Sequence, residues 1–180
     1  WLSAVLGEAG ARLAEVRAIH PDAGGLVIAT DQEHARGIAA LLRERFRTTA
    51  VVVTSDDPGS SARIGAFAGS DTEWLVAVRM VSEGVDIPRL RVGVFATTTT
   101  TDLFFRQAVG RFVRWMPGIR DQRSWLFIPD DPRLRDALAG LPLGGLPPVL
   151  MDGGRRWWLA ELPSEADLRN AQPNWEAIVA

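Results

Sequence analysis

The chain has 180 residues, a length that suits one domain with a short additional segment. Hydrophobic residues make up 47% of it and the mean hydropathy is +0.03, which predicts a packed core and excludes a disordered chain. The net charge of −2 excludes binding to nucleic acid through bulk positive charge, so any site for a polyanion must be a local group of arginines.

Scarce residue types exclude further classes of protein. The chain has no cysteine and only two histidines, so we expect no disulfide and no metal site. No apolar run is long enough to span a membrane and no signal peptide is visible, which predicts a cytoplasmic protein without a membrane partner. Because the first residue is Trp1 and not Met, we expect a fragment of a longer protein, and the composition suits a bacterial source.

The first part of the chain predicts helices that alternate with short buried strands. Apolar residues at helical spacing predict a helix over residues 3–18. The apolar run 26–29 predicts a buried strand, and the helix expected over 31–46 begins at Asp31, which is suited to cap it. The patterns that follow predict a strand at 51–54, a helix at 60–68 and a strand at 74–78.

The same alternation continues through a strand at 92–96, a helix at 102–114, a strand at 125–128 and a helix at 132–139. It predicts an α/β fold, with a mostly parallel sheet covered by helices on both faces. From Leu141 the composition becomes rich in Pro and Gly. We therefore divide the chain into a domain, 1–140, and a linker with a Trp-rich extension, 141–180. Few contacts are expected to cross that junction, so the extension is predicted to be dispensable for folding.

Threonines end two of the predicted strands. Ligands of parallel sheets collect at the carboxyl ends of the strands, where Thr30 and Thr54 are expected. Their hydroxyls and neighbouring amides suit a sugar-phosphate backbone, which positions a strand without reading its sequence. For Thr54 a simple turn is an equally good interpretation. His34, near the start of a predicted helix, is interpreted as a solvated side chain.

The predicted helix over 102–114 has a polar stripe. Gln107, Arg111 and Arg114 fall at i, i+4 and i+7 and share one side, while Phe105 and Val109 take the other. Neighbouring guanidiniums repel unless an anion lies near them, and their planar fork suits phosphate. The stripe therefore predicts a helix that faces phosphate; the alternative is a surface helix rich in Arg on an unrelated α/β domain.

Two sequence motifs, which follow one another along the chain, resemble motifs of a known protein family. The segment Gln107-x-x-Gly110-Arg111-x-x-Arg114 resembles the last motif of superfamily 2 helicases, and Ser82-Glu83-Gly84-Val85-Asp86 resembles the motif before it. Together with the strand and helix over 26–42, they cover residues 24–130 in the order and spacing of the second, C-terminal RecA-like domain of these enzymes. Within this superfamily, the chain resembles the DEAD/DEAH-like and the type III restriction-like helicases.

The resemblance implies a role for each matched residue. Arg111 and Arg114 would reach the γ-phosphate of ATP as arginine fingers, and Gln107 would order their network. Gly84 and Asp86 would approach the nucleotide, with Glu83 and Gly110 in the same nucleotide-facing set; Asp86 has a second interpretation, as a local cap or ion-pair partner. Where many relatives have Thr, this chain has Val78, so either Arg79 or Ser82 would replace its contact to nucleic acid or the binding would be weaker.

Parts of the ATP site are missing from the sequence. A phosphate loop needs lysine, of which the chain has none, and it has no acidic box for Mg²⁺. The resemblance thus implies that ATP and Mg²⁺ are held by an N-terminal RecA-like domain of a parent protein and that the fragment alone binds neither tightly and is inactive. The partners implied are that domain and the backbone of DNA or RNA.

Three other interpretations stay open. The first is a helicase-like binding module without catalysis. The second is a Rossmann-type nucleotide-binding protein, against which no Gly-x-Gly-x-x-Gly follows the first strand. The third concerns the run Arg155-Arg156-Trp157-Trp158, which either stacks on bases or forms a strand with one Trp packed inward.

Overall fold

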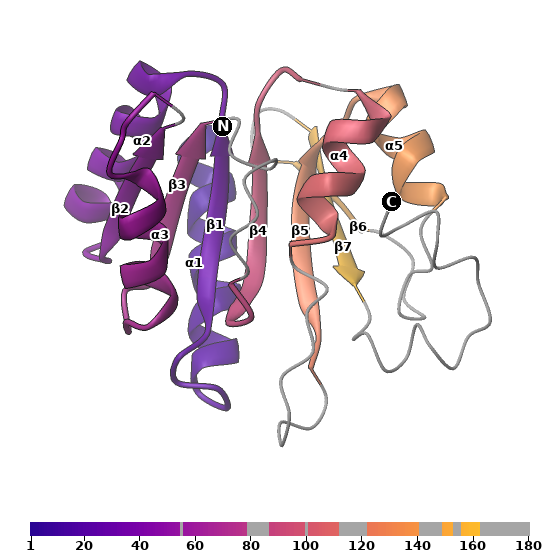
Figure 1. The fold of residues 1–180 in the computed structure, drawn as a ribbon. Coiled ribbons are helices and arrows are strands. Elements are labelled where there is room, and N and C mark those ends of the chain that lie inside the picture. Colours follow the sequence, from indigo (N-terminus) through magenta and orange to yellow (C-terminus); the bar gives the residue numbers. More distant parts are fainter. Residues whose placement is uncertain are drawn as a thin grey trace.

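One mixed sheet organises the molecule (Figure 1). The computed structural model describes residues 1–54, 56–78, 87–99, 101–111, 122–140, 149–152 and 156–162. Within these residues seven strands pair in the order β2-β3-β1-β4-β5-β7-β6. The strands are β1 (Gly24–Ala29), β2 (Ala50–Thr54), β3 (Trp74–Val78), β4 (Leu90–Ala96), β5 (Ser124–Pro129), β6 (Val149–Asp152) and β7 (Arg156–Leu162). The first five run parallel, whereas β7 is antiparallel to both β5 and β6.

Helices cover both faces of this sheet, as the alternating pattern predicts (Figure 1). Two helices, α1 (Leu2–Arg17) and α2 (Gln32–Arg45), pack on one face. Three others pack on the opposite face: α3 (Ser60–Ala68), α4 (Asp102–Val109) and α5 (Pro132–Ala139). The predicted α/β fold is thereby confirmed. Among the described helices, none is long and apolar enough to cross a bilayer.

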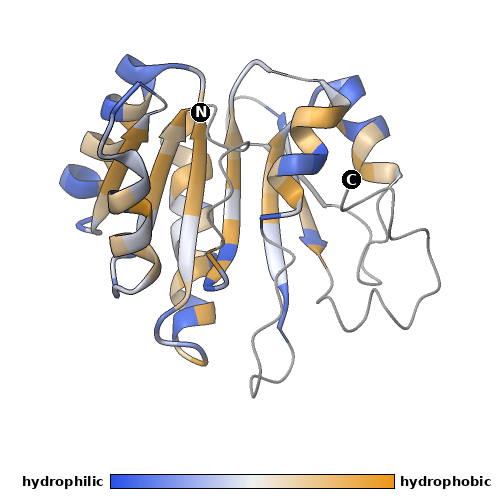
Figure 2. Ribbon diagram, in the orientation of Figure 1, coloured by the Kyte–Doolittle hydropathy of each residue, from blue (hydrophilic) through white to orange (hydrophobic). Residues whose placement is uncertain are grey.

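The core lies in two layers, one on each side of the sheet. Every residue of β1, β3 and β4 is buried, as expected for central strands covered on both faces. Figure 2 shows the hydrophobic strands between helices whose outer surfaces are hydrophilic. Two of the helices start at the carboxylates of aspartates: Asp31 accepts from the His34 amide of α2 at 2.8 Å, and Asp131 from the Arg133 amide of α5 at 2.9 Å. The Arg133 side chain also holds the pKa of Asp131 below its usual value.

A buried arginine ties the end of α3 and two loops together at the amino edge of the sheet. Arg89 is 4% exposed, and its guanidinium donates to the carbonyls of Phe67 at 3.0 Å, Asp22 at 2.6 Å and Thr72 at 2.5 Å. It also lies 4.0 Å from the centroid of the Phe67 ring. Burial lowers the pKa of Arg89 from its usual value. Five N–H donors in a rigid fork make these bonds possible, so no other side chain replaces this one.

We expect Arg89→Met to lower the free energy of unfolding by about 3 kcal/mol or more, because three backbone carbonyls, that of buried Phe67 among them, lose their donor. Arg89→Lys should rescue little, since a single ammonium cannot reach all three. The matched control is Arg43→Met, an exposed arginine on α2, with an expected change within about 0.5 kcal/mol. Urea unfolding of the three variants checks this. Equal stability of Arg89→Met and the control would show that the loops hold without the guanidinium.

The described part of the C-terminal extension belongs to the sheet. Six residues of β7 pair with β5, from Leu162 opposite Ser124 to Trp157 opposite Pro129. Trp157 is 1% exposed and belongs to the core on the side of α1, whereas half-buried Trp158 donates its indole N–H to Asp130 at 2.7 Å. The expectation of few contacts across the junction after residue 140 is therefore wrong. The physical reason is that β5 offers an open edge, and the apolar residues of β7 cover it.

Candidate functional site

The carboxyl ends of the parallel strands form one edge of the molecule. The strand register aligns Thr54 with Val78, Val78 with Ala29, and Ala29 with Ala96. Thr30 therefore lies one residue beyond this line, two strands away from Thr54. The structure brings these two threonines to the same edge, as their positions at strand ends predict. Their contact with nucleic acid stays a prediction.

The two threonines differ in what they offer a ligand. The Thr30 amide donates to His34 Nδ1 at 3.4 Å. The Thr30 hydroxyl donates to the Ala96 carbonyl, also at 3.4 Å. A phosphate at Thr30 would have to displace one of these long bonds. A turn follows Thr54, whose carbonyl accepts from the Asp57 amide at 3.2 Å. This bond does not involve the Thr54 hydroxyl, so Thr54 can take part in the turn and still contact a phosphate.

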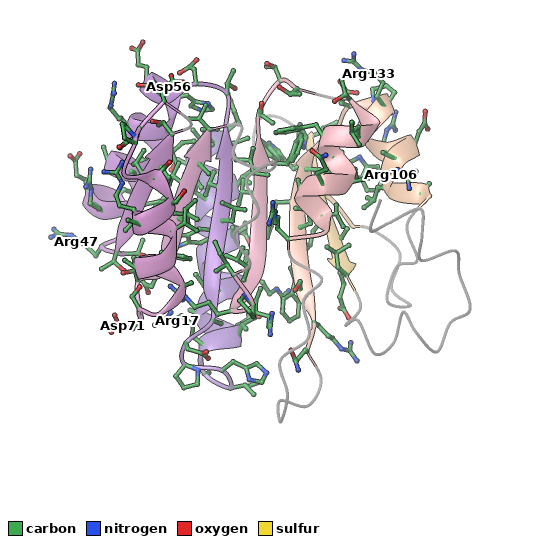
Figure 3. The ribbon with its side chains drawn as sticks, in the orientation of Figure 1. Arg17, Arg47, Asp56, Asp71, Arg106 and Arg133 are labelled. Atoms are coloured by element: carbon green, nitrogen blue, oxygen red, sulfur yellow. The ribbon has the colours of Figure 1, made fainter. Side chains whose placement is uncertain are left out.

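Charges of both signs are paired along this edge. Gln32, at the start of α2, donates to Asp56 at 2.9 Å, and Asp57 forms an ion pair with Arg63 of α3. Figure 3 shows Asp56 and Arg133 at this edge, while Arg17 and Asp71 lie at the opposite one. Carboxylates thus alternate with arginines here, and the described part of the edge does not form a positive surface.

The helix α4 carries the polar stripe as far as it is described. Phe105, Ala108 and Val109 are buried against the sheet, whereas Gln107 is exposed and Arg111 is half-buried. The regular helix ends at Val109, and a tighter turn follows in which the Arg111 amide donates to the Ala108 carbonyl at 3.0 Å. The prediction that Phe105 and Val109 face the core is confirmed. The predicted helix end at residue 114 lies outside the described residues.

Gly110 needs no special backbone, because its φ of −57° suits any residue. A Cβ built at this position would lie 3.4 Å from the Arg106 carbonyl oxygen and 3.5 Å from that of Gln107, which are ordinary contacts. The described packing of α4 therefore gives no reason for a glycine here. A group outside α4 that approaches the backbone closely would explain the glycine.

The remaining predicted site residues lie outside the described residues. They are Arg79, Ser82, Glu83, Gly84, Asp86 and Arg114. Their roles stay predictions. Within the part of the chain that the structure describes, no group of three or more His, Asp or Glu side chains is placed to hold a metal ion.

A cavity that the sequence analysis did not predict opens at the same edge. It has a volume of about 350 Å³ and lies at the ends of β1, β4 and β5. Trp1 and Trp157 line it and stack with ring centroids 5.5 Å apart. His34 lines it too and is half-buried. The other lining residues are Thr30, Phe95, Ala96, Thr97, Thr98, Pro129, Asp130, Asp131 and Arg133.

Sequence comparison finds long relatives of this chain in mycobacteria. The uncharacterized protein ML1624 of Mycobacterium leprae is 53% identical over 135 residues, which cover 74% of this chain and 22% of that protein. The uncharacterized protein Rv2917 of Mycobacterium tuberculosis is 52% identical over 142 residues, or 78% of this chain and 23% of that one. The chain thus spans less than a quarter of these relatives. No family model matches it.

Comparison with solved structures finds a helicase-like fold. A structure of the Mss116p DEAD-box helicase domain 2 bound to an RNA duplex has a TM-score of 0.55. The two share 12% sequence identity over 66% of this chain and 46% of that one. At this identity the likeness shows the fold alone, which is an α/β domain of RecA-like type.

Proposed function

We propose that this chain is the second motor domain of an ATP-dependent nucleic-acid helicase or translocase. In the parent protein, Arg111 and Arg114 act as arginine fingers on ATP that is bound by the N-terminal RecA-like domain, and Gln107 orders them. Gly84, Asp86, Glu83 and Gly110 form the rest of the nucleotide-facing surface. The mycobacterial relatives are more than three times as long as this chain, which leaves room for such a first domain, and their source agrees with a bacterial protein.

The observation that carries the proposal is the exposed Gln107 of α4, followed by Arg111, on a helicase-like fold. The buried side, with Phe105 and Val109, fixes the helix against the sheet, so Gln107 points away from the core and half-buried Arg111 follows it. A polar stripe held on a rigid element can act on a ligand that another domain presents.

ATP and Mg²⁺ belong to the other domain in this proposal. The chain has no lysine for a phosphate loop, and its described residues offer no cluster of metal ligands. When bound there, Mg²⁺ and ATP supply the phosphoryl group and neutralise part of its charge. This chain supplies guanidiniums that stabilise the charge developing as that group leaves. We therefore expect no ATP turnover by the 180-residue chain alone.

The nucleic-acid backbone would cross the carboxyl edge of the sheet at Thr54 and Thr30, with Arg79 and Ser82 beside them. These groups position a strand without reading its sequence. Because carboxylates and arginines are paired along the described edge, only a few phosphate contacts are available. The chain should accordingly bind single strands weakly, whatever their sequence.

Binding of a labelled single-stranded oligonucleotide to the 180-residue chain tests this at several salt concentrations. We expect log K to fall with log salt by about 0.7 for each phosphate contact. Thr54→Asp should weaken binding and reduce that slope by about 0.7. The matched control is Ala11→Asp, which adds the same charge at an exposed position of α1 and should change binding little. Equal effects of the two variants would contradict a track at Thr54, and tight binding that ignores salt would contradict backbone contacts altogether.

A further inference from the structure

The cavity at the ends of β1, β4 and β5 lies where the chain connections diverge. After β1 the chain passes through α2 to β2 on one side of the sheet, and after β4 it passes through α4 to β5 on the other. β1 and β4 are neighbours, so their carboxyl ends form the topological switch point of the parallel part. Open α/β sheets bind ligands in the crevice at such a point. The cavity therefore lies where such sheets bind ligands, and it is separate from the polar stripe on α4.

One wall of the cavity is aromatic. Trp1 and Trp157 are stacked with an angle of 26° between their rings. Trp157 is buried, but Trp1 keeps 47% of its surface exposed, so the pair is accessible from solvent through Trp1. An accessible indole stacked on a buried one is a rigid platform for a further flat ring.

The polar groups of the cavity both donate and accept hydrogen bonds. His34 Nδ1 accepts from the Thr30 amide, so the ring proton is on Nε2, which can donate. The Thr30 hydroxyl directs its hydrogen to the Ala96 carbonyl and offers a lone pair. The ligand that fits must therefore present donors and acceptors.

Carboxylates make the cavity unsuitable for a phosphate. Asp130 and Asp131 line it, and their charges are offset by arginines at 3.1–3.4 Å: Arg133 pairs with Asp131, and Arg135 and Arg156 with Asp130. These arginines already have carboxylate partners, so a phosphate would have to compete with Asp130 and Asp131 for them, and it offers only acceptors. The edge of a nucleobase is neutral and carries both donors and acceptors. A volume of about 350 Å³ suits one base with its sugar.

We propose that this cavity holds one unstacked base of the nucleic-acid strand that crosses the carboxyl edge. The base stacks on the exposed indole of Trp1, and its edge meets His34. The inference rests on the proposed function, which brings the strand to this edge through backbone contacts alone. It adds a base contact that a pure backbone track lacks, and it makes Trp1 and His34 binding residues.

Two oligonucleotides of equal length and charge test the proposal with the 180-residue chain, one with bases and one abasic throughout. Fluorescence anisotropy at matched salt should give a Kd at least about fivefold lower for the oligonucleotide with bases, the scale of one stacked base. The salt slopes of the two should agree, because the phosphate contacts are the same. The intact oligonucleotide should also quench tryptophan fluorescence.

Variants assign that difference to the cavity. Thr98→Leu adds volume at an exposed lining residue, and Thr101→Leu makes the same change at an exposed position of the same segment that does not line the cavity. Thr98→Leu and Trp1→Ala should abolish the preference for bases without changing the Kd of the abasic strand. Thr101→Leu should leave the preference for bases intact, and Trp1→Phe should keep most of that preference.

Each other result contradicts a distinct part of the reasoning. Equal Kd values for the two oligonucleotides, with normal salt slopes, would overturn the base site and leave the proposed function standing. Loss of binding to both strands in Thr98→Leu would assign the cavity to phosphate contacts and so overturn the inference as well. Absence of salt-dependent binding to either strand by the unmodified chain would instead remove the nucleic-acid track on which the inference depends.

Discussion

A chain that ends at Gly140 is expected to be insoluble or to melt at least about 10 °C below the full chain. This truncation removes β6 and β7, and with β7 the six residue pairs that cover β5. Three buried apolar side chains leave with it: Trp157, Ala160 and Leu162. What remains is β5 as an edge strand, with an open row of backbone groups and an uncovered apolar surface.

The size of the effect follows from Trp157. Replacing a buried tryptophan by alanine costs about 3–5 kcal/mol, and each kcal/mol lowers the Tm of a domain of this length by about 2–4 °C. Trp157→Ala alone should therefore lower the Tm by roughly 10 °C, and the truncation should do more. Thermal melts followed by near-UV circular dichroism measure both.

A chain that ends after Leu162 is the matched control for the truncation. It keeps every strand of the sheet, so we expect a Tm close to that of the full chain. If the chain ending at Gly140 melted as the full chain does, the pairing of β7 with β5 would contribute little. The sequence-based expectation of a dispensable extension would then be correct.

Local patterns predicted the fold because they report local physics. The runs at β1, β3 and β4 are apolar throughout because both faces of these strands are covered. Asp31 was recognised as a cap because the capping bond closes within three residues. A strand with one Trp packed inward was one of the two interpretations of residues 155–158, and β7 with buried Trp157 agrees with it. Its pairing with β5 was not predicted, because that pairing is a long-range choice that follows a segment rich in Pro and Gly.

In the candidate site, too, local patterns could be predicted from the sequence, whereas contacts between remote parts of the chain could not. Thr30 and Thr54 were placed at one edge because strand ends are visible in the sequence and parallel strands end together. The cavity was not predicted, because its walls join Trp1, His34, Thr97 and Trp157 from remote parts of the chain. Arg89 was missed for a related reason: its three acceptors are backbone carbonyls, which leave no trace in a sequence.

In the complete parent enzyme, Arg111→Ala and Arg114→Ala are each expected to reduce ATP turnover by about 10³-fold or more, the scale of an arginine finger. A finger acts on charge that develops in the transition state, so kcat should fall far more than KM rises. Lys at either position should rescue little, because an ammonium does not reproduce the planar fork. Steady-state ATPase assays with saturating nucleic acid measure the effect, and nucleotide binding should be largely retained.

Arg106→Ala is the control on the same helix. Arg106 lies one residue before Gln107, which places it about 100° from Gln107 around the helix axis. Removal of its charge should leave turnover within about twofold if the stripe, and not the charge of α4 as a whole, acts on ATP. Thermal melts of all variants separate kinetic loss from unfolding. Wild-type turnover in both Arg111→Ala and Arg114→Ala would remove the catalytic part of the proposed function and favour a helicase-like binding module without ATP chemistry.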